Sequence, residues 1–283
     1  LMILKNNLKK KYFAVYGLGI TGKSVVNFFK KNKIKNYVTY DDLKKNNNLL
    51  KFISYLKLAD YIILSPGINI KNSKFKKYLL KFKHKIITDL DLFYIFNEKN
   101  KTIVITGSNG KSTTCKILEQ LLKKNNFNVK MGGNIGKSIL DLKIKKNTII
   151  IIEASSYQLA YSKFVKPTYS LFLNISKDHL DWHGNMNEYI KAKLKIFSLQ
   201  EKKDIALIKD KKIIKLFKNK KFQSKLKIIN PHNYLKIKNK IINEYLKKNL
   251  NNENMSFAYE ISKFFNITDS NFVKSFSSFN GLP

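Results

Sequence analysis

Strand-like segments rich in β-branched and aromatic residues alternate with helical segments along almost the whole chain. Parallel strands must be joined by crossover connections, which are usually helices, so this alternation predicts α/β units built on parallel sheets. No apolar run approaches the roughly 18 residues of a membrane span. The segments expected to be strands are 12–17, 36–42, 60–67, 86–88, 102–106, 148–154, 169–175, 204–208 and 225–229.

The polar segment 97–101 interrupts this alternation, which restarts immediately after it. We therefore expect two α/β domains, one at 1–96 and one at 97–283. The tail 251–279 is expected to form two helices. The stretch 209–248 is rich in lysine and asparagine, and we interpret most of it as a solvated face with poorly specified loops.

Residues 106–113, Thr-Gly-Ser-Asn-Gly-Lys-Ser-Thr, stand between a β-branched run and a helical segment. Glycines let backbone N–H groups approach phosphates, and the N-terminus of the following helix favours negative charge. The spacing is shorter than GxxxxGK[ST], because Ile105 stands where the first glycine of that motif belongs. We interpret the segment as a phosphate-binding loop rather than an ordinary turn. The residues predicted to contact ATP are Gly107, Ser108, Asn109, Gly110, Lys111, Ser112 and Thr113, with Lys111 on the β- and γ-phosphates and a hydroxyl of Ser112 or Thr113 on Mg²⁺.

A second glycine-rich turn, Gly-Leu-Gly-Ile-Thr-Gly at 17–22, also follows a strand-like segment and precedes a helical one. It matches GxGxxG, and Asp41 stands about twenty residues further on. Taken alone, this pattern indicates a Rossmann-like domain with an NAD site. Its glycines suit any pyrophosphate, however, so the pattern does not by itself select the ligand.

The net charge of +36 raises the alternative of a nucleic-acid-binding protein. All 55 basic residues are lysines, and arginine, the usual reader of guanine, is absent. The abundance of lysine, asparagine, isoleucine, phenylalanine and tyrosine indicates adenine- and thymine-rich codons, which explains the charge without a polyanionic partner. The chain has one cysteine, Cys115, so it forms no internal disulfide, which suits a reducing cytoplasm.

Five blocks in order along the chain resemble the Mur ligase family of ATP-dependent amide-bond ligases. The loop 106–113 and the segment GGNIG most resemble the branch that adds D-glutamate to UDP-N-acetylmuramoyl-L-alanine in peptidoglycan precursor synthesis. The resemblance covers essentially the whole chain. It implies an N-terminal Rossmann-like domain that binds the UDP substrate, followed by a P-loop-type mononucleotide-binding α/β domain. The five blocks are 106–113, 132–136, 153–159, 174–184 and 189–197.

The resemblance also implies a magnesium centre, with two ions, opposite the phosphate loop. Glu153 ends a very apolar strand, where a carboxylate is costly unless it is paired or bound to metal. An ammonium at Lys193 would repel Mg²⁺, but in the family the matching lysine is carbamylated by CO₂ and becomes an anionic ligand. A buried lysine with a lowered pKa could react in this way. The implied metal ligands are Ser112, Glu153, His179 and carbamylated Lys193, and the implied catalytic residues are Lys111, His179 and Lys193.

The turn at 17–22 holds the UDP of the sugar substrate in the family, rather than NAD. The implied substrate contacts also reach the muramoyl-peptide end, and two asparagines resemble the family's pair near the nucleotide. Gln158 and Tyr157 are equally well explained as packing residues. The implied UDP-substrate residues are Ile20, Thr21, Asp42, Ser65, Pro66, Gly67, Asn134 and Ser155, and the nucleotide asparagines are Asn251 and Asn254.

The implied reaction activates the substrate carboxylate with ATP as an acyl phosphate, which the amine of D-glutamate then attacks. Alternatives are another Mur-type ligase that uses L-alanine, a diamino acid or folylpolyglutamate, and an NAD-dependent oxidoreductase. We expect a cytoplasmic monomer with no nucleic-acid or membrane partner. In the family a third, amino-acid-binding domain follows the Gly-Leu-Pro of 281–283. We therefore expect that domain to be absent and this chain alone to bind nucleotide but to ligate poorly or not at all.

Overall fold

The computed structural model describes residues 7–44, 48–279 and 281, so Leu282 and Pro283 lie outside the described residues. Its strands form two sheets, and every strand pair in both is parallel. The smaller sheet has the order β2-β1-β3-β4, with β1 (Phe13–Tyr16), β2 (Tyr37–Tyr40), β3 (Tyr61–Leu64) and β4 (Ile86–Ile87). The larger has the order β10-β9-β8-β5-β7-β6, with β5 (Thr102–Thr106), β6 (Val129–Gly133), β7 (Ile149–Glu153), β8 (Tyr169–Phe172), β9 (Ile205–Ile208) and β10 (Lys225–Ile228).

Helices and short 3-10 turns connect these strands. No helix in the described ranges is long and apolar enough to cross a lipid bilayer. The α-helices are α2 (Ile20–Lys31), α3 (Leu49–Leu58), α4 (Lys76–Lys81), α5 (Asp89–Phe96), α6 (Lys111–Lys124), α7 (Ser156–Tyr161), α8 (Leu180–His183), α9 (Met186–Leu194), α10 (Lys211–Asn219), α11 (Pro231–Lys238), α12 (Glu244–Lys247), α13 (Asn252–Phe264) and α14 (Asp269–Lys274). The 3-10 turns are η1 (Leu8–Lys10), η2 (Ile70–Asn72), η3 (Lys83–Lys85), η4 (Ile139–Asp141), η5 (Lys195–Phe197) and η6 (Asn249–Asn251).

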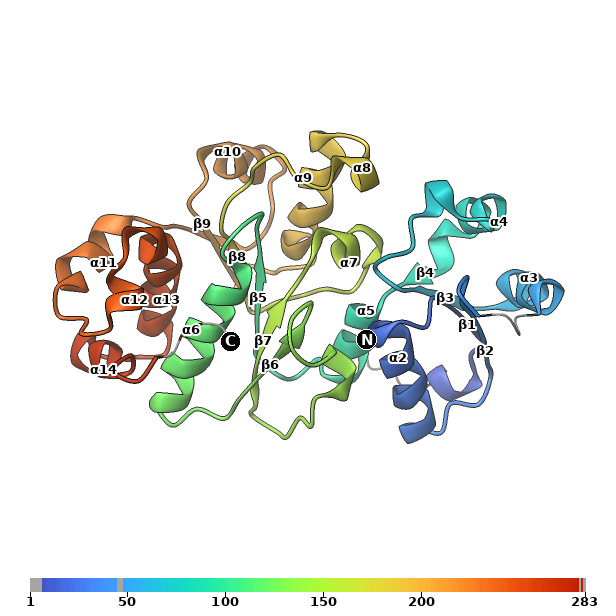
Figure 1. Cartoon of the computed structure of the whole chain (residues 1–283), viewed down its shortest axis with the longest axis horizontal. Helices are drawn as coiled ribbons and strands as arrows, with labels where there is room; N and C mark the ends of the chain where they lie inside the picture. The colour runs from blue at the N-terminus through green and yellow to red at the C-terminus, as the bar shows by residue number, and fades with distance from the viewer. Residues whose placement is uncertain (1–6, 45–47, 280, 282–283) are drawn as a thin grey trace.

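The two sheets lie in separate parts of an elongated molecule. Figure 1 shows the small sheet with α2, α3 and α4 at one end, the large sheet in the middle, and α11 to α14 at the other end. Helix α6 lies between the large sheet and α13. Each part is thus an α/β layered structure, which confirms the fold class predicted from the alternating segments.

The central strands of both sheets are apolar because helices cover both of their faces. Every residue of β1, β5, β7 and β8 is buried. In each sheet the strand order reverses beside one strand: β1 lies between β2 and β3, and β5 lies between β7 and β8. Ligands of open parallel sheets bind at the carboxyl ends of strands at such reversals. The two glycine-rich turns, 17–22 and 107–110, follow β1 and β5.

Helix α5 joins the two parts. Its residues Leu90 and Phe93 belong to an apolar cluster that includes Phe13 of the small sheet and Val104 of the large one. Asp91 accepts hydrogen bonds from the backbone N–H groups of Lys163 (2.8 Å) and Phe164 (2.7 Å), in the loop after α7. The two sheets therefore share a continuous core rather than being joined by a bare linker.

The prediction of poorly specified loops over most of 209–248 is wrong, because helices α10, α11 and α12 lie there beside the predicted strand, which is β10. In α10, Ile213 and Phe217 are four residues apart and both are buried, so a single apolar stripe anchors an otherwise lysine-rich helix. The Asp210 side chain caps the helix by accepting from the N–H of Ile213. The high lysine content hid this amphipathic pattern.

Leu121 of α6 offers a test of the larger core. It is fully buried, in a cluster with Ile151 of β7. We expect Leu121→Ala to lower the free energy of unfolding by about 2–5 kcal/mol, because it leaves a cavity in a close-packed core. Leu250, which is 70% exposed, provides the matched control. In urea denaturation Leu250→Ala should change stability little, and equal losses in the two variants would contradict this description of the core.

Candidate functional site

The segment 107–113 leads from the end of β5 into the start of α6. Gly110 has φ +80°, a left-handed conformation that glycine adopts without strain, and α6 begins at the next residue. The Lys111 side chain folds back over the loop, and its Nζ donates to the carbonyl oxygens of Gly107 (3.0 Å) and Ser108 (2.8 Å). The first N–H groups of a helix have no partner within it, so this turn presents backbone donors together with a cation. Such an arrangement suits polyphosphate.

The loop is held in place by the segment that follows β8. The N–H of Ser108 donates to the Asn174 carbonyl (3.0 Å), and the N–H of Asn109 donates to the Asn174 side chain (2.9 Å). The Ser108 hydroxyl also lies 3.1 Å from the hydroxyl of Tyr189. These contacts fix the loop's shape before any ligand binds.

Glu153 lies beside this loop at the carboxyl end of β7, where it is only 2% exposed. Its register partner is Ile105, near the end of β5, so the carboxyl ends of β5 and β7 meet at one edge of the sheet. The Ser112 hydroxyl donates to Glu153 Oε2 (2.7 Å), and the Asn134 amide donates to Oε1 (2.9 Å). Three predicted site residues from three separate segments therefore form one hydrogen-bonded group.

Lys193 of α9 reaches the same loop where the loop leaves β5. It is 1% exposed, and its Nζ donates to the Gly107 carbonyl (2.7 Å) and lies 4.7 Å from the centroid of the Tyr189 ring. Burial, together with the neighbouring charge of Lys111, lowers the pKa of Lys193 to about 7 against the opposing effect of the Asp178 and Glu153 charges. A large fraction of its amines is therefore neutral, and hence nucleophilic, near pH 7.

His179 approaches this group through aromatic rings rather than through direct hydrogen bonds. It caps α8 with φ +52°, and its ring centroid lies 4.8 Å from that of Tyr157 and 6.0 Å from that of Tyr189. Its Nδ1 is 3.2 Å from an Asp178 carboxylate oxygen. In a histidine that ligates metal, such a contact fixes which ring nitrogen is free.

The side chains around the loop include oxygen donors that could bind Mg²⁺. No three His, Cys, Asp or Glu side chains of the described residues gather closely enough to hold a metal. The hydroxyl of Ser112 and the buried carboxylate of Glu153 are, however, hard oxygen donors of the kind Mg²⁺ prefers, and Mg²⁺ commonly uses few protein ligands together with phosphate oxygens. The residues present therefore fit a magnesium ion that is shared with a bound polyphosphate.

The paired asparagines lie behind the loop. The Oδ1 of Asn254 accepts from the Thr114 hydroxyl (3.2 Å). Asn251 is fully buried, and its Oδ1 accepts a 3.4 Å hydrogen bond from the Asn254 amide. Asn254 therefore contacts the start of α6 directly, whereas Asn251 is linked to it through its hydrogen bond with Asn254.

A cleft of about 490 Å³ opens at the carboxyl end of β1 and extends to the segment after β6. Ser155 lies outside its lining: the Ser155 hydroxyl caps α7 by accepting from the Gln158 N–H (3.3 Å), and Gln158 itself lines the cleft. The structure thus brings together residues of both sheets around one space. The predicted UDP-substrate residues in its lining are Ile20, Thr21, Asp42, Ser65, Pro66, Gly67 and Asn134.

Two residues at the site were not predicted from the sequence. Tyr189 contacts Ser108, Lys193 and His179, and Asn174 holds the backbone of the phosphate loop. The four-residue spacing of Tyr189 and Lys193 on one helical face was a usable signal for the first. Asn174 carries no such signal, because its role depends on β8 lying beside β5.

Gly110 provides a test of the loop geometry. A Cβ at this position would lie 2.5 Å from Asn254 Oδ1, in a backbone conformation that alanine adopts only with strain. We expect Gly110→Ala to displace the loop, weaken ADP binding by about tenfold and destabilise the fold by about 1–2 kcal/mol. Gly19 is the control, because its added Cβ would meet nothing within 4 Å and its φ is −65°. Calorimetric ADP titrations that showed equal affinities for the two variants would contradict the prediction.

Comparison with known proteins indicates the family of this chain. Residues 105–273 match the family model of the Mur ligase middle domain. The chain is 31% identical to the UDP-N-acetylmuramoylalanine–D-glutamate ligase of Rickettsia bellii, over 97% of this chain and 68% of that protein. It is 33% identical to the enzyme of the same name from Rickettsia prowazekii, over 98% and 68%.

A solved structure also shares the fold. The UDP-N-acetylmuramate:L-alanyl-γ-D-glutamyl-meso-diaminopimelate ligase of Neisseria meningitides superposes with a TM-score of 0.63 at 11% identity, covering 96% of this chain and 99% of that one. At this identity the likeness concerns the fold alone. The family model and the relatives settle the family: this chain belongs to the Mur ligases, which are ATP-dependent, amide-bond-forming ligases.

Proposed function

We propose that this protein ligates D-glutamate to UDP-N-acetylmuramoyl-L-alanine, a step in peptidoglycan precursor synthesis in the cytoplasm. The proposal is supported by the Rickettsia relatives named for this reaction. The observation that carries it is the joint position of Lys111, Glu153 and Lys193 around one glycine-rich loop. We assign UDP-substrate binding to residues 1–96 and ATP binding to residues 97–283, and we propose a monomer.

In this assignment ATP lies with its β- and γ-phosphates over residues 107–113. The N–H groups at the start of α6 would bind phosphate oxygens, and Lys111 would turn from its carbonyl partners to the phosphates. Asn254 would support the adenosine side from behind the loop. Lys111 offsets the repulsion between two anions, the substrate carboxylate and the γ-phosphate, and holds them in line for transfer.

The magnesium centre would use Ser112, Glu153, His179 and carbamylated Lys193, with two ions. Bound Mg²⁺ supplies positive charge that stabilises the transferring phosphoryl group. Carbamylation requires a neutral amine, and burial gives Lys193 the lowered pKa that this needs. The resulting carbamate would be anionic, so it would no longer repel the cation that Glu153 and Ser112 attract.

The sugar nucleotide would occupy the cleft at the carboxyl end of β1, with UDP against the turn at 17–22. Its acyl end would then point to Asn134, which is hydrogen-bonded to Glu153. The cleft therefore runs from the proposed diphosphate subsite to Asn134, whose partner Glu153 lies beside the nucleotide loop. The amine of D-glutamate would attack the acyl phosphate formed there, and phosphate would leave through a tetrahedral intermediate.

The identity of the UDP substrate can be tested by binding, without a complete reaction cycle. We expect calorimetric titration to give the tightest binding for UDP-N-acetylmuramoyl-L-alanine. UDP-N-acetylmuramate lacks the alanine and the UDP-N-acetylmuramoyl dipeptide carries an extra residue, so each should bind at least about tenfold more weakly. Tighter binding of either analogue would assign the chain to another branch of the family. Tight NAD binding at the same cleft would instead support an oxidoreductase.

A further inference from the structure

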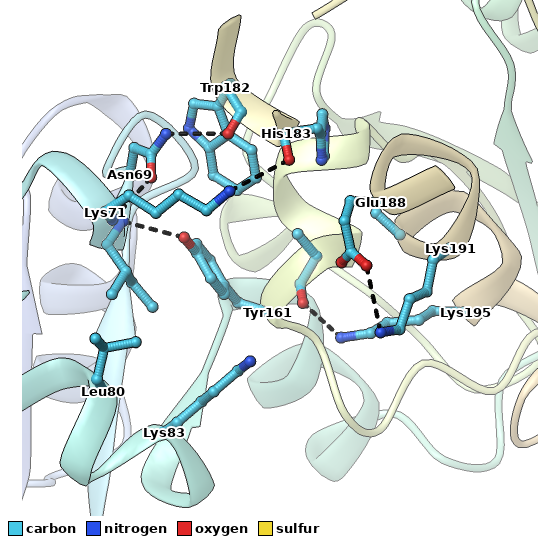
Figure 2. Close-up of a pocket in the computed structure, with 13 residues that line it drawn as sticks. Asn69, Lys71, Leu80, Lys83, Tyr161, Trp182, His183, Glu188, Lys191 and Lys195 are labelled. Carbon is cyan, nitrogen blue, oxygen red and sulfur yellow. Dashed lines mark hydrogen bonds and ion pairs between the residues drawn. The ribbon is translucent and has the colours of Figure 1, made fainter. Parts of the chain in front are cut away.

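A second cavity, of about 330 Å³, lies between the two parts of the molecule. One wall comes from η2 and the segment around α4, and the other comes from α7, α8 and α9. Its lining shares no residue with the phosphate loop or with the cleft at the carboxyl end of β1. Figure 2 shows Lys71 and Lys83 approaching from the first wall and Lys191 and Lys195 from the second.

The charge of this cavity is positive and poorly compensated. Its lining contains four lysines but only one carboxylate, Glu188, which lies 3.6 Å from the Nζ of Lys191. Lys71 and Lys195 donate to neutral backbone carbonyls, at 3.5 Å to His183 and at 3.1 Å to Ser162, which do not cancel their charge.

The same cavity has an apolar, aromatic side. The rings of Tyr161 and Trp182 lie 5.4 Å apart, and Leu80 closes the space from the opposite wall, as Figure 2 shows. A rigid aromatic surface binds flat apolar groups at low entropic cost, and lysines at its edge attract anions. The cavity therefore combines the two features that a ligand with one apolar and one anionic end requires.

Helix α9 connects this cavity to the nucleotide loop. Lys191 and Lys195 lie one turn apart at the cavity, where Lys195 begins the 3-10 turn that continues α9. Tyr189 and Lys193 lie one turn apart on the face that meets the loop. A molecule in the cavity would thus rest against the helix that positions Lys193.

We propose that this cavity binds a small molecule in which an aromatic or branched apolar body carries a phosphate or a carboxylate. The cations select the anionic end, the Tyr161 and Trp182 rings select the body, and the volume limits the ligand to a small molecule. Because the two walls belong to different parts of the chain, bound ligand would also hold those parts together.

Trp182 is the chain's single tryptophan and lines this cavity, so its fluorescence responds to a ligand bound there. It also lines a neighbouring hollow that reaches Asp42 and Gly67, so variants must assign the signal. We expect phenyl phosphate to change that fluorescence saturably and calorimetry to give the same Kd. Inorganic phosphate, which lacks the ring, should bind at least about tenfold more weakly, and neutral benzyl alcohol should behave likewise. Benzoate tests whether a carboxylate can replace the phosphate.

Lysine variants distinguish binding in this cavity from nonspecific attraction of an anion to the many other lysines of the protein. The exposed pair K83Q/K191Q should raise the Kd of phenyl phosphate by at least about tenfold. The pair K211Q/K218Q removes two exposed lysines from α10 and should leave the Kd unchanged, as should Lys111→Met at the phosphate loop. Single variants K83Q and K191Q, each checked by thermal melting, guard against a folding defect in the pair.

Three results would overturn the proposal: no saturable signal, a Kd unaffected by K83Q/K191Q, or a Kd raised by Lys111→Met. The last result would mean that phenyl phosphate occupies the nucleotide loop. The experiment involves no ligation step, so its outcome is independent of the proposed reaction.

Discussion

Replacing Lys111 with methionine is expected to weaken ATP binding by about 100-fold. The side chain lies over the loop, where its Nζ donates to the neutral carbonyls of Gly107 and Ser108, so its cation can turn to the phosphates. Two charge-assisted hydrogen bonds at about 1.5 kcal/mol each account for this loss. Methionine keeps the length and apolar stem of lysine but removes the charge. Isothermal titration with ATP measures the effect.

Lys116→Met is the matched control for this prediction. Lys116 lies on the same helix, further from the loop, where its Nζ pairs with Glu119 at 3.2 Å. Its loss removes the same charge from the protein, so any general electrostatic effect on ATP should appear in both variants. ATP affinities that fall equally in Lys111→Met and Lys116→Met would rule out a specific role for Lys111.

Replacing Lys193 with arginine is expected to abolish carbamate formation and to weaken Mg²⁺ binding in the presence of ADP by at least about 100-fold. The guanidinium of arginine stays protonated and does not add CO₂. A fixed cation would then stand where an anionic ligand is proposed, and a unit charge pair about 4 Å apart is worth about 4 kcal/mol at an effective dielectric constant of 20. Carbon-13 NMR with labelled bicarbonate detects the carbamate, and calorimetry measures the Mg²⁺ affinity.

Two further observations make the Lys193 test specific. Lys191→Arg, in the same helix but 70% exposed at its side chain, should leave the carbamate resonance intact. At a fixed concentration of dissolved CO₂ the resonance should grow as the pH rises through about 7, because burial lowers the pKa of Lys193 to that value and only the neutral amine reacts. A resonance that persists in Lys193→Arg would place the carbamate elsewhere.

Several features of the fold followed from the sequence because their signals are local. The isoleucine run that ends in Glu153 predicts a buried parallel strand, and the glycines of 106–113 predict a turn into a helix. The structure has both, as β7 and as the loop between β5 and α6. The positions of the two glycine-rich turns at the ends of strands were also predictable, because each turn follows a strand-like segment and precedes a helical one.

Other features depend on tertiary contacts that a single sequence does not reveal. Asn174 acts on the loop only because β8 lies beside β5, and Tyr189 acts there only because α9 packs against it. The helices within 209–248 were obscured because lysine is abundant there and only one or two apolar positions per helix are buried in the core. The cavity between the two parts likewise requires η2 and α9 to be adjacent.

The most direct test of the account is a crystal structure of the protein grown with ADP and Mg²⁺. The account predicts that the diphosphate lies on residues 107–113, with Mg²⁺ contacting Ser112 and the Glu153 side of the loop, and with a carbamate on Lys193. It would be contradicted by ADP bound instead at the turn 17–22, or by Mg²⁺ bound away from Glu153 with Lys193 still hydrogen-bonded to Gly107.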